Sequence, residues 1–303
     1  MATGSVVGPW AKDKLDRLGK YLRAYTTIMK DQRRWCRGYH YIDAFAGPGD
    51  HTIRNADAGN RQIAQTVLSE IAEFGAEHEE QQQFLAGSPR VALAISHPFT
   101  NYVFVERSPE RVASLEQLKM DYGDTRKIVI RNEDCTKYLK ERVAANPRID
   151  WKTNRAVVFL DPFGMQVGWP TIEALAATGA IEIFLNFPVG MAIQRLLKRR
   201  PENFTDAQRR RLDAYFGSPD WFDVLYKKTK TLFDDDSQEK VNASGEALLK
   251  WYRDRLRKHF KHVSKAALIR NTRGGHLYYL LLASHNKTGV KIANDILSAG
   301  EAV

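Results

Sequence analysis

The sequence predicts an α/β fold, in which helices cover both faces of a mostly parallel sheet of seven strands that ends in an antiparallel hairpin. Three observations predict it. Apolar runs alternate with amphipathic segments along much of the chain, as in parallel sheets with crossover helices. The runs at 157–160 and 183–185 are apolar without interruption, which is typical of strands buried on both faces. A Gly-Gly pair within 266–286 joins two apolar runs and indicates the hairpin.

The first predicted element is a helix over residues 10–36. Leu15, Leu18 and Leu22 recur there at roughly helical spacing, with basic residues between them. The start of this segment, GPWAKDK, is interpreted as a surface helix with one anchoring tryptophan. A short apolar strand follows and ends at Asp43, where a glycine turn begins.

Residues 50–86 are polar and rich in Gln and Glu, so we expect an insertion or loop with some helix. The next helix begins with Ser88 and Pro89, as N-cap and first-turn residue. Strands and helices then alternate. Strands are predicted within 101–106, 127–134, 156–161 and 181–188, and helices within 108–122, 135–145 and 171–179.

Residues 190–262 break this alternation. They are strongly charged, rich in aromatic residues and helical in pattern, and their length indicates an insertion rather than a connection. The core is therefore predicted at 1–189 and 263–303. The insertion interleaves Lys and Arg with Trp251, Tyr252 and Phe260. This mixture is typical of a surface that follows phosphates and stacks bases, and equally of an amphipathic bundle whose rings face the core.

The formal net charge of +10 and the isoelectric point near 9.5 favour a nucleic acid as partner, because a basic surface attracts phosphate backbones. No run of about 18 apolar residues occurs, which argues against a membrane span. The chain begins without the apolar core of a signal peptide. Two cysteines are too few for a disulfide framework or a cysteine metal site. We expect a cytoplasmic protein without a metal.

The glycine turn is the first candidate site. Its strand delivers Asp43 to the carboxyl edge of the sheet, where open α/β sheets bind ligands. Gly47 and Gly49 let the backbone pass close to a ligand, although glycines also serve turns that bind nothing. The G-x-G-x-x-G pattern of dinucleotide loops is not met.

Acidic residues end the next two predicted strands. Glu106 is positioned to accept the ribose hydroxyls of a nucleoside, or it is a helix cap or surface carboxylate. Arg107 flanks the base or is solvated. Asp134 ends the third strand, with Glu133 as an adjacent competitor and Cys135 beside it.

The turn Asp161–Pro162–Phe163 follows the fourth strand. It resembles the (Asp/Asn/Ser)-Pro-Pro-aromatic turn with which N-methyltransferases hold an exocyclic amine and stack its base, but it has one proline. The alternative is a buried turn after a core strand. A second candidate turn, Asn186 to Pro188, is expected to form the pocket wall. His259 and His262 are expected on a solvated helix face.

Two resemblances sharpen these expectations. The loop D-x-F-A-G-x-G, which includes Phe45 and Ala46, resembles the cofactor loop of DNA and RNA methyltransferases. Almost the whole chain resembles the three-Cys-motif partner family. That resemblance rests on the segments VGPWAKDKLDRLGKYL, YIDAFAGPG, GSPRVAL, YVFVE, FLDPFG and HLYYLLLASHNKTG, in this order.

The resemblance implies a Rossmann-like class I methyltransferase fold that binds S-adenosylmethionine, with the opening helix near the cofactor. Asp134 would accept the adenine amino group and the backbone amide of Cys135 would assist. It implies a possible partner, a separate cysteine-motif protein, but no established substrate. We expect N-methylation of a base in RNA or DNA by Asp161, Pro162 and Phe163. The alternative is a non-catalytic module that binds cofactor or partner in a defence or repair system.

Overall fold

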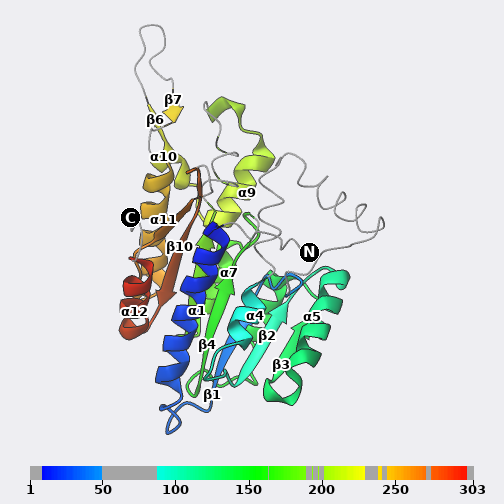
Figure 1. Cartoon of the computed structure of the whole chain (residues 1–303). Helices are drawn as coiled ribbons and strands as arrows, with labels where there is room; N and C mark the ends of the chain where they lie inside the picture. Colours follow the sequence, from blue (N-terminus) through cyan, green and yellow to red (C-terminus); the bar gives the residue numbers. More distant parts are fainter. Residues whose placement is uncertain are drawn as a thin grey trace.

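The computed structural model places most of the chain in one α/β unit (Figure 1). The described residues are 9–49, 87–162, 164–188, 193, 197, 201–228, 238–240, 244–270 and 274–298. The predicted insertion at 50–86 lies outside them, as does Phe163.

The centre of the molecule is a mostly parallel sheet. Its strands are β1 (Gly38–Asp43), β2 (Asn101–Val105), β3 (Ile128–Arg131), β4 (Asn154–Leu160), β5 (Ile181–Phe187), β8 (His262–Val263), β9 (Ala267–Arg270) and β10 (His276–Ser284). The order is β3-β2-β1-β4-β5-β10-β8, and β9 also pairs with β10. The first five strands are parallel, while β10 runs antiparallel to its neighbours.

The mostly parallel sheet and the C-terminal hairpin are confirmed. Within the described residues the sheet has eight strands rather than the predicted seven, because its last edge is interrupted. Ala283 of β10 pairs with Val263 of β8, whereas Leu280 pairs with Ala267 of β9. The two short strands therefore share one position in the sheet.

Helices cover both faces of the sheet (Figure 1). They are α1 (Pro9–Met29), α4 (Ser88–Leu93), α5 (Pro109–Tyr122), α6 (Cys135–Lys137) with a π-helical continuation (Tyr138–Ala144), α7 (Trp169–Ala177) and α12 (Lys287–Leu297). Two separate cores result. Val157 and Phe159 of β4 pack in the core with α1, α4, α5 and α12, and Val158 and Leu160 pack with α7. Alternate residues of one strand thus fill opposite cores, which explains its uninterrupted apolar run.

Two predicted helix boundaries were wrong. The first helix ends at Met29, not at residue 36, because the chain turns back there to enter β1. The N-cap of α4 is Gly87, and Ser88 is already helical and buried. The Ser88 hydroxyl is buried and has no hydrogen-bond partner among the described residues, so it does not serve as the expected cap.

The described part of the charged insertion contains α9 (Asp206–Phe216), α10 (Trp221–Leu225) and α11 (Ser244–His259). It also holds a two-stranded pair, β6 (Tyr226–Lys228) with β7 (Gln238–Lys240), where only helix was expected. Tyr252 and Phe260 are each 1% exposed, and the Tyr252 ring stacks on Phe187 of β5. These two rings face the core, as the bundle interpretation requires.

Among the described helices, none combines the length and the apolar character that a membrane crossing needs.

Candidate functional site

The candidate site lies at the carboxyl ends of β1, β4 and β5, which are neighbours in the sheet (Figure 1). The strand order reverses between β1 and β4, and the crevice at such a switch point is where open α/β sheets bind ligands. Asp43 ends β1, Asp161 directly follows β4, and Asn186 lies near the end of β5. All three side chains are buried.

The glycine loop folds back over the end of β1. One carboxylate oxygen of Asp43 accepts the Phe45 amide at 3.2 Å, and the other accepts the Tyr41 hydroxyl at 3.2 Å. The Ala46 amide donates to the carbonyl of Val105 at the end of β2. Gly47 has φ of 62°, a conformation that side chains disfavour. The loop is thus fixed to the tips of two adjacent strands.

Gly49 has a structural reason of its own. Its φ is 75°, and a Cβ there would lie 2.8 Å from Leu118 Cδ2 of α5. This glycine is therefore required for packing as well as for the turn, with or without a ligand.

Glu106 joins β2 to the glycine loop. Its Oε2 accepts the Gly47 amide at 3.0 Å, and its Oε1 accepts the Ser108 amide at 2.8 Å. Arg107 is exposed, as expected for a solvated side chain. The structure thus brings Glu106 and the loop together, while a carboxylate oxygen retains lone pairs for further donors.

Asp134 lies after β3, the strand next to β2, and is exposed. It caps α6, because its Oδ1 accepts the Lys137 amide at 3.0 Å. Cys135 is buried, and burial raises the pKa of its thiol to about 11, so the thiol is protonated near neutral pH. Glu133, the competitor, is half-buried.

Lys14 of α1 completes the site, a role that was not predicted from the sequence. Its ammonium is fully buried and bonds Asp161 Oδ2, where a surface helix was expected. It also lies over the rings of Phe159 and Tyr278, at 5.8 and 5.2 Å from their centroids. Lys14 is four residues before Leu18, on the apolar face of α1, and this spacing is the signal that could have found it.

Asn186 also acts directly on Asp161. Its Nδ2 donates to Asp161 Oδ1 at 2.6 Å, whereas the sequence placed it in the pocket wall. Its own Oδ1 is buried and has no hydrogen-bond donor among the described residues. Pro162, the residue after Asp161, is also buried. An unsatisfied buried acceptor is costly, so this oxygen is a ready partner for a ligand N–H.

Burial changes the charge balance of the site. It lowers the pKa of the Lys14 ammonium to about 8, although Asp161 and Asp43 oppose that shift. It raises the pKa of Asp43 to about 7, against hydrogen bonds from the Phe45 amide and the Tyr41 hydroxyl that favour the carboxylate. The site thus holds groups that titrate close to neutral pH.

The raised pKa of Asp43 predicts that the free energy of unfolding falls as the pH rises from about 4 to about 7. In that range the folded chain keeps the Asp43 proton and the unfolded chain releases it, because the ordinary pKa is 3.8. The contribution reaches about 1.4 kcal/mol per pH unit. Asp43→Asn should remove this part of the fall in urea unfolding measured by circular dichroism. The exposed Asp134→Asn is the control, and an unchanged pH slope in Asp43→Asn would contradict the prediction.

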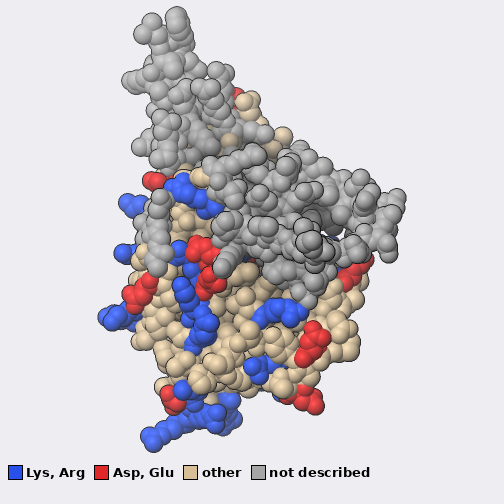
Figure 2. Space-filling view, viewed as in Figure 1, with Lys and Arg blue, Asp and Glu red and all other residues tan. Residues whose placement is uncertain are grey.

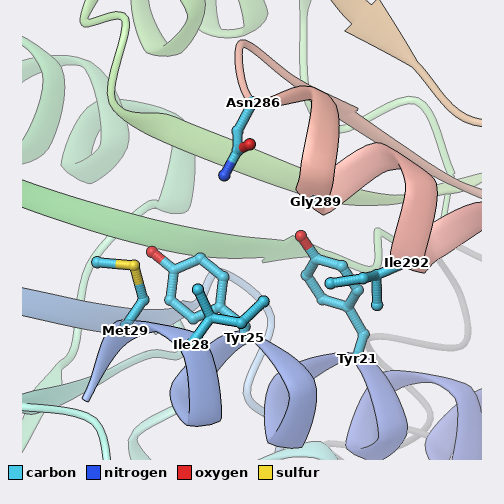
Figure 3. A pocket seen from close by; sticks show the side chains of 7 residues that line it. All are labelled: Tyr21, Tyr25, Ile28, Met29, Asn286, Gly289 and Ile292. Atoms are coloured by element: carbon cyan, nitrogen blue, oxygen red, sulfur yellow. The ribbon is translucent and has the colours of Figure 1, made fainter. Parts of the chain in front are cut away.

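A small hollow lies between α1 and α12 (Figure 3). Its volume of about 20 Å³ has room for about one water molecule. Beside it, the Tyr21 hydroxyl donates to the buried Glu182 of β5. A Cβ on Gly289 would lie 2.9 Å from Glu182 Oε1. The contacts of Tyr21 and Gly289 with Glu182, beside this hollow, help to hold α1 and its residue Lys14 against the sheet.

No group of three potential metal ligands occurs in the described part of the chain. His259 is not simply solvated as expected: its Nε2 lies 3.5 Å from Glu173 Oε1, and its ring meets Trp169 edge-on.

Comparisons with known proteins add little. No protein-family model matches the chain, and no curated protein matches it. A crystal structure of protein LPL1258 from Legionella pneumophila str. Philadelphia 1, of family DUF519, is similar at 12% identity with a TM-score of 0.48. The match covers 97% of this chain and 93% of that one. The crystal structure of EvdMO1 is similar at 10% identity with a TM-score of 0.35, over 87% of this chain and 40% of that one. Likenesses this distant carry no functional argument.

Proposed function

We propose that the chain is a class I S-adenosylmethionine-dependent methyltransferase that methylates a nitrogen of a nucleic-acid base. One observation carries the proposal: the glycine loop, bonded to Glu106, and the buried Asp161 lie at the carboxyl ends of β2, β1 and β4, which are neighbours in a sheet with five parallel strands and an antiparallel hairpin. The resemblance to the three-Cys-motif partner family implies a sheet of this kind, with a glycine loop after its first strand.

The residues fit the cofactor. Asp43, Phe45, Ala46, Gly47 and Gly49 would form the loop around it. Glu106 would accept the ribose hydroxyls, and Asp134 and the Cys135 amide would hold the adenine, with Arg107 beside it. Two buried carboxyl groups, Asp43 and Asp161, face one buried ammonium. The pKa of Asp43 is about 7, and a ligand that brings positive charge would favour its carboxylate form. When bound, the cofactor supplies an electrophilic methyl group on its sulfonium.

The chain's own residues would orient the amine. Asp161 accepts one amine hydrogen and Asn186 Oδ1 accepts the other, so that the nitrogen lone pair has one direction. Both Asp161 oxygens already have partners, Lys14 and Asn186, but each retains a second lone pair. Asp161 is then the nearest carboxylate to receive the proton that the methylated nitrogen releases.

A nucleic acid is the substrate that the charge favours. The net charge of +10 attracts polyanions over small neutral molecules. Methylation of a protein or small molecule is the less favoured class on this ground alone.

A second function is a non-catalytic module that binds cofactor, or a separate cysteine-motif protein, without turnover. The contact between Lys14 and Asp161 favours it, because the carboxylate that would hold the amine is already neutralised by the chain itself.

Two measurements test these functions. Calorimetry with S-adenosylhomocysteine asks whether the pocket exists, and we expect saturable binding at one site. Tritium transfer from labelled S-adenosylmethionine to total RNA or DNA then separates the two functions. Binding with transfer supports the enzyme, and binding without transfer supports the module. Absence of binding contradicts both cofactor proposals.

Glu106→Ala should weaken S-adenosylhomocysteine binding about 10- to 100-fold, because hydrogen bonds to a carboxylate contribute about 1.5–3 kcal/mol. Glu106 also holds the Gly47 amide, so its loss loosens the loop. Asp134→Ala should have a smaller effect, since Asp134 is exposed and its Oδ1 caps α6. Calorimetry on both variants measures the difference. A larger loss for Asp134→Ala would reverse the assignment of the two carboxylates.

A further inference from the structure

A strongly basic turn lies at the opposite edge of the sheet from the candidate site. Residues 30–37 connect α1 to β1 and contain four basic residues and one acidic residue, a net charge of +3. Figure 2 shows Lys and Arg gathered at this end of the molecule, at the base of the view. Arg33, Arg34 and Arg37 are exposed and Lys30 is half-buried. Among the described residues, no carboxylate lies within ion-pair distance of these four side chains.

An exposed tryptophan stands within this turn. Trp35 is 42% exposed, one of three large apolar side chains that are exposed in the described part of the chain. Its Nε1 donates to Gln32 Oε1 at 2.9 Å. The guanidinium of Arg155 lies over the ring, 4.5 Å from its centroid. The ring is therefore held in place while much of its surface remains accessible.

Arg155 is itself fixed. Its Nη1 donates to the carbonyls of Trp151 at 2.8 Å and Asn154 at 2.6 Å. The nearby Asp150 makes no ion pair with the turn. Its carboxylate accepts the Lys152 amide and the Thr153 hydroxyl, and its charge acts on Arg37 from beyond ion-pair distance. The Trp35 ring is thus held in one orientation beside a turn that remains basic.

We propose that this Trp35 surface, formed by Lys30, Arg33, Arg34, Trp35, Arg37 and Arg155, binds a single-stranded segment of nucleic acid. Unstacked bases stack on exposed aromatic rings, and basic side chains follow the phosphates. Arginine outnumbers lysine here, and its planar group matches phosphate better than a lysine ammonium. An acidic peptide or an anionic membrane would use the charges but gain little from a fixed ring.

The surface goes beyond the proposed methyl transfer, because it requires no cofactor. It lies at the start of β1, whereas the candidate site lies at the end of the same strand. Six residues of strand separate the two by about 20 Å. The Trp35 surface would therefore hold a part of the nucleic acid away from the residues at Asp161.

Fluorescence anisotropy of the full chain with labelled strands of oligodeoxythymidine and of oligouridine tests this proposal. The two strands separate DNA from RNA as the source of the shared chemistry. Trp35→Ala should weaken binding about tenfold, the loss of one stacked base, and leave the salt dependence unchanged. Trp35→Phe, which keeps a ring, should recover most of it. Arg33→Ala/Arg34→Ala should lower the slope of log K against log salt by about 1.4, since each phosphate contact in a single strand contributes about 0.7.

The matched control removes two exposed charges elsewhere: Lys287→Ala/Lys291→Ala on α12 should leave the affinity within about twofold. Calorimetry with S-adenosylhomocysteine should be unchanged in Trp35→Ala, so this proposal and the proposed cofactor site fail independently. The proposal is overturned if the wild-type chain binds neither strand, or if Trp35→Ala binds as well as wild type. It is also overturned if polyglutamate or phosphatidylserine vesicles compete as well as the unlabelled strands.

Discussion

Asp161→Ala is expected to lower the free energy of unfolding by about 3–5 kcal/mol. The substitution leaves the Lys14 ammonium fully buried without its counter-ion, and breaking a buried ion pair from one side costs that much. Asn186 also loses the acceptor of its Nδ2. Urea unfolding followed by circular dichroism at pH 7 measures the loss.

The same pair predicts strong coupling. Lys14→Met should also destabilise the chain, because it leaves Asp161 buried without its cationic partner. The double variant Lys14→Met/Asp161→Leu should lose much less than the sum of the single losses, since no buried charge is left unpaired.

A pair with an exposed carboxylate on the same helix provides the control. Asp13 bonds Arg17 one turn apart, and the Asp13 side chain is 44% exposed. Arg17 is buried, but it keeps the carbonyls of Ile296 and Leu297 as acceptors when Asp13 is removed. Asp13→Ala should cost no more than about 1 kcal/mol. If Asp161→Ala costs as little as Asp13→Ala, the pair does not anchor α1 to the sheet.

Local pattern predicted most of the sheet because each core strand carries its own signal. The run at 157–160 sends alternate side chains into two cores, and an apolar run bounded by polar residues is visible without knowledge of the partners. The hairpin was equally local, with Gly274 at φ of 78° in its turn. The number of strands could not be predicted from local pattern, because the break between β8 and β9 depends on how each pairs with β10.

The candidate site was predicted in part for the same reason. Asp43, Glu106 and Asp161 were found because each ends an apolar run. The pairing of Lys14 with Asp161 joins positions 147 residues apart, and no local pattern encodes such a contact. Ser88 is not the cap, because the helix begins one residue earlier, with Gly87 as its N-cap. A contact between positions far apart in the sequence decided the role of Lys14.

Asp161→Asn is expected to reduce methyl transfer about 10²- to 10³-fold and to leave S-adenosylhomocysteine affinity within about twofold. An amide has the shape of the carboxylate, so the variant avoids the cavity of Asp161→Ala. Asn186 can rotate its amide, so that its Oδ1 accepts from the new Nδ2. What disappears is the negative charge that would draw the amine hydrogens and receive the released proton, and such groups contribute on this scale. The Lys14 ammonium also loses its counter-ion, so both measurements are made below the unfolding temperature of the variant.

Tritium transfer at saturating nucleic acid, together with calorimetry on the same preparation, measures both quantities. Asp150→Asn is the matched control, because Asp150 is an exposed carboxylate at the other edge of the sheet, and it should change neither. If transfer and affinity fall together in Asp161→Asn, Asp161 holds the cofactor rather than the amine. If transfer is unchanged, residues other than Asp161 orient the amine. The ion pair of Lys14 with Asp161 is then structural and holds α1 over the end of β4.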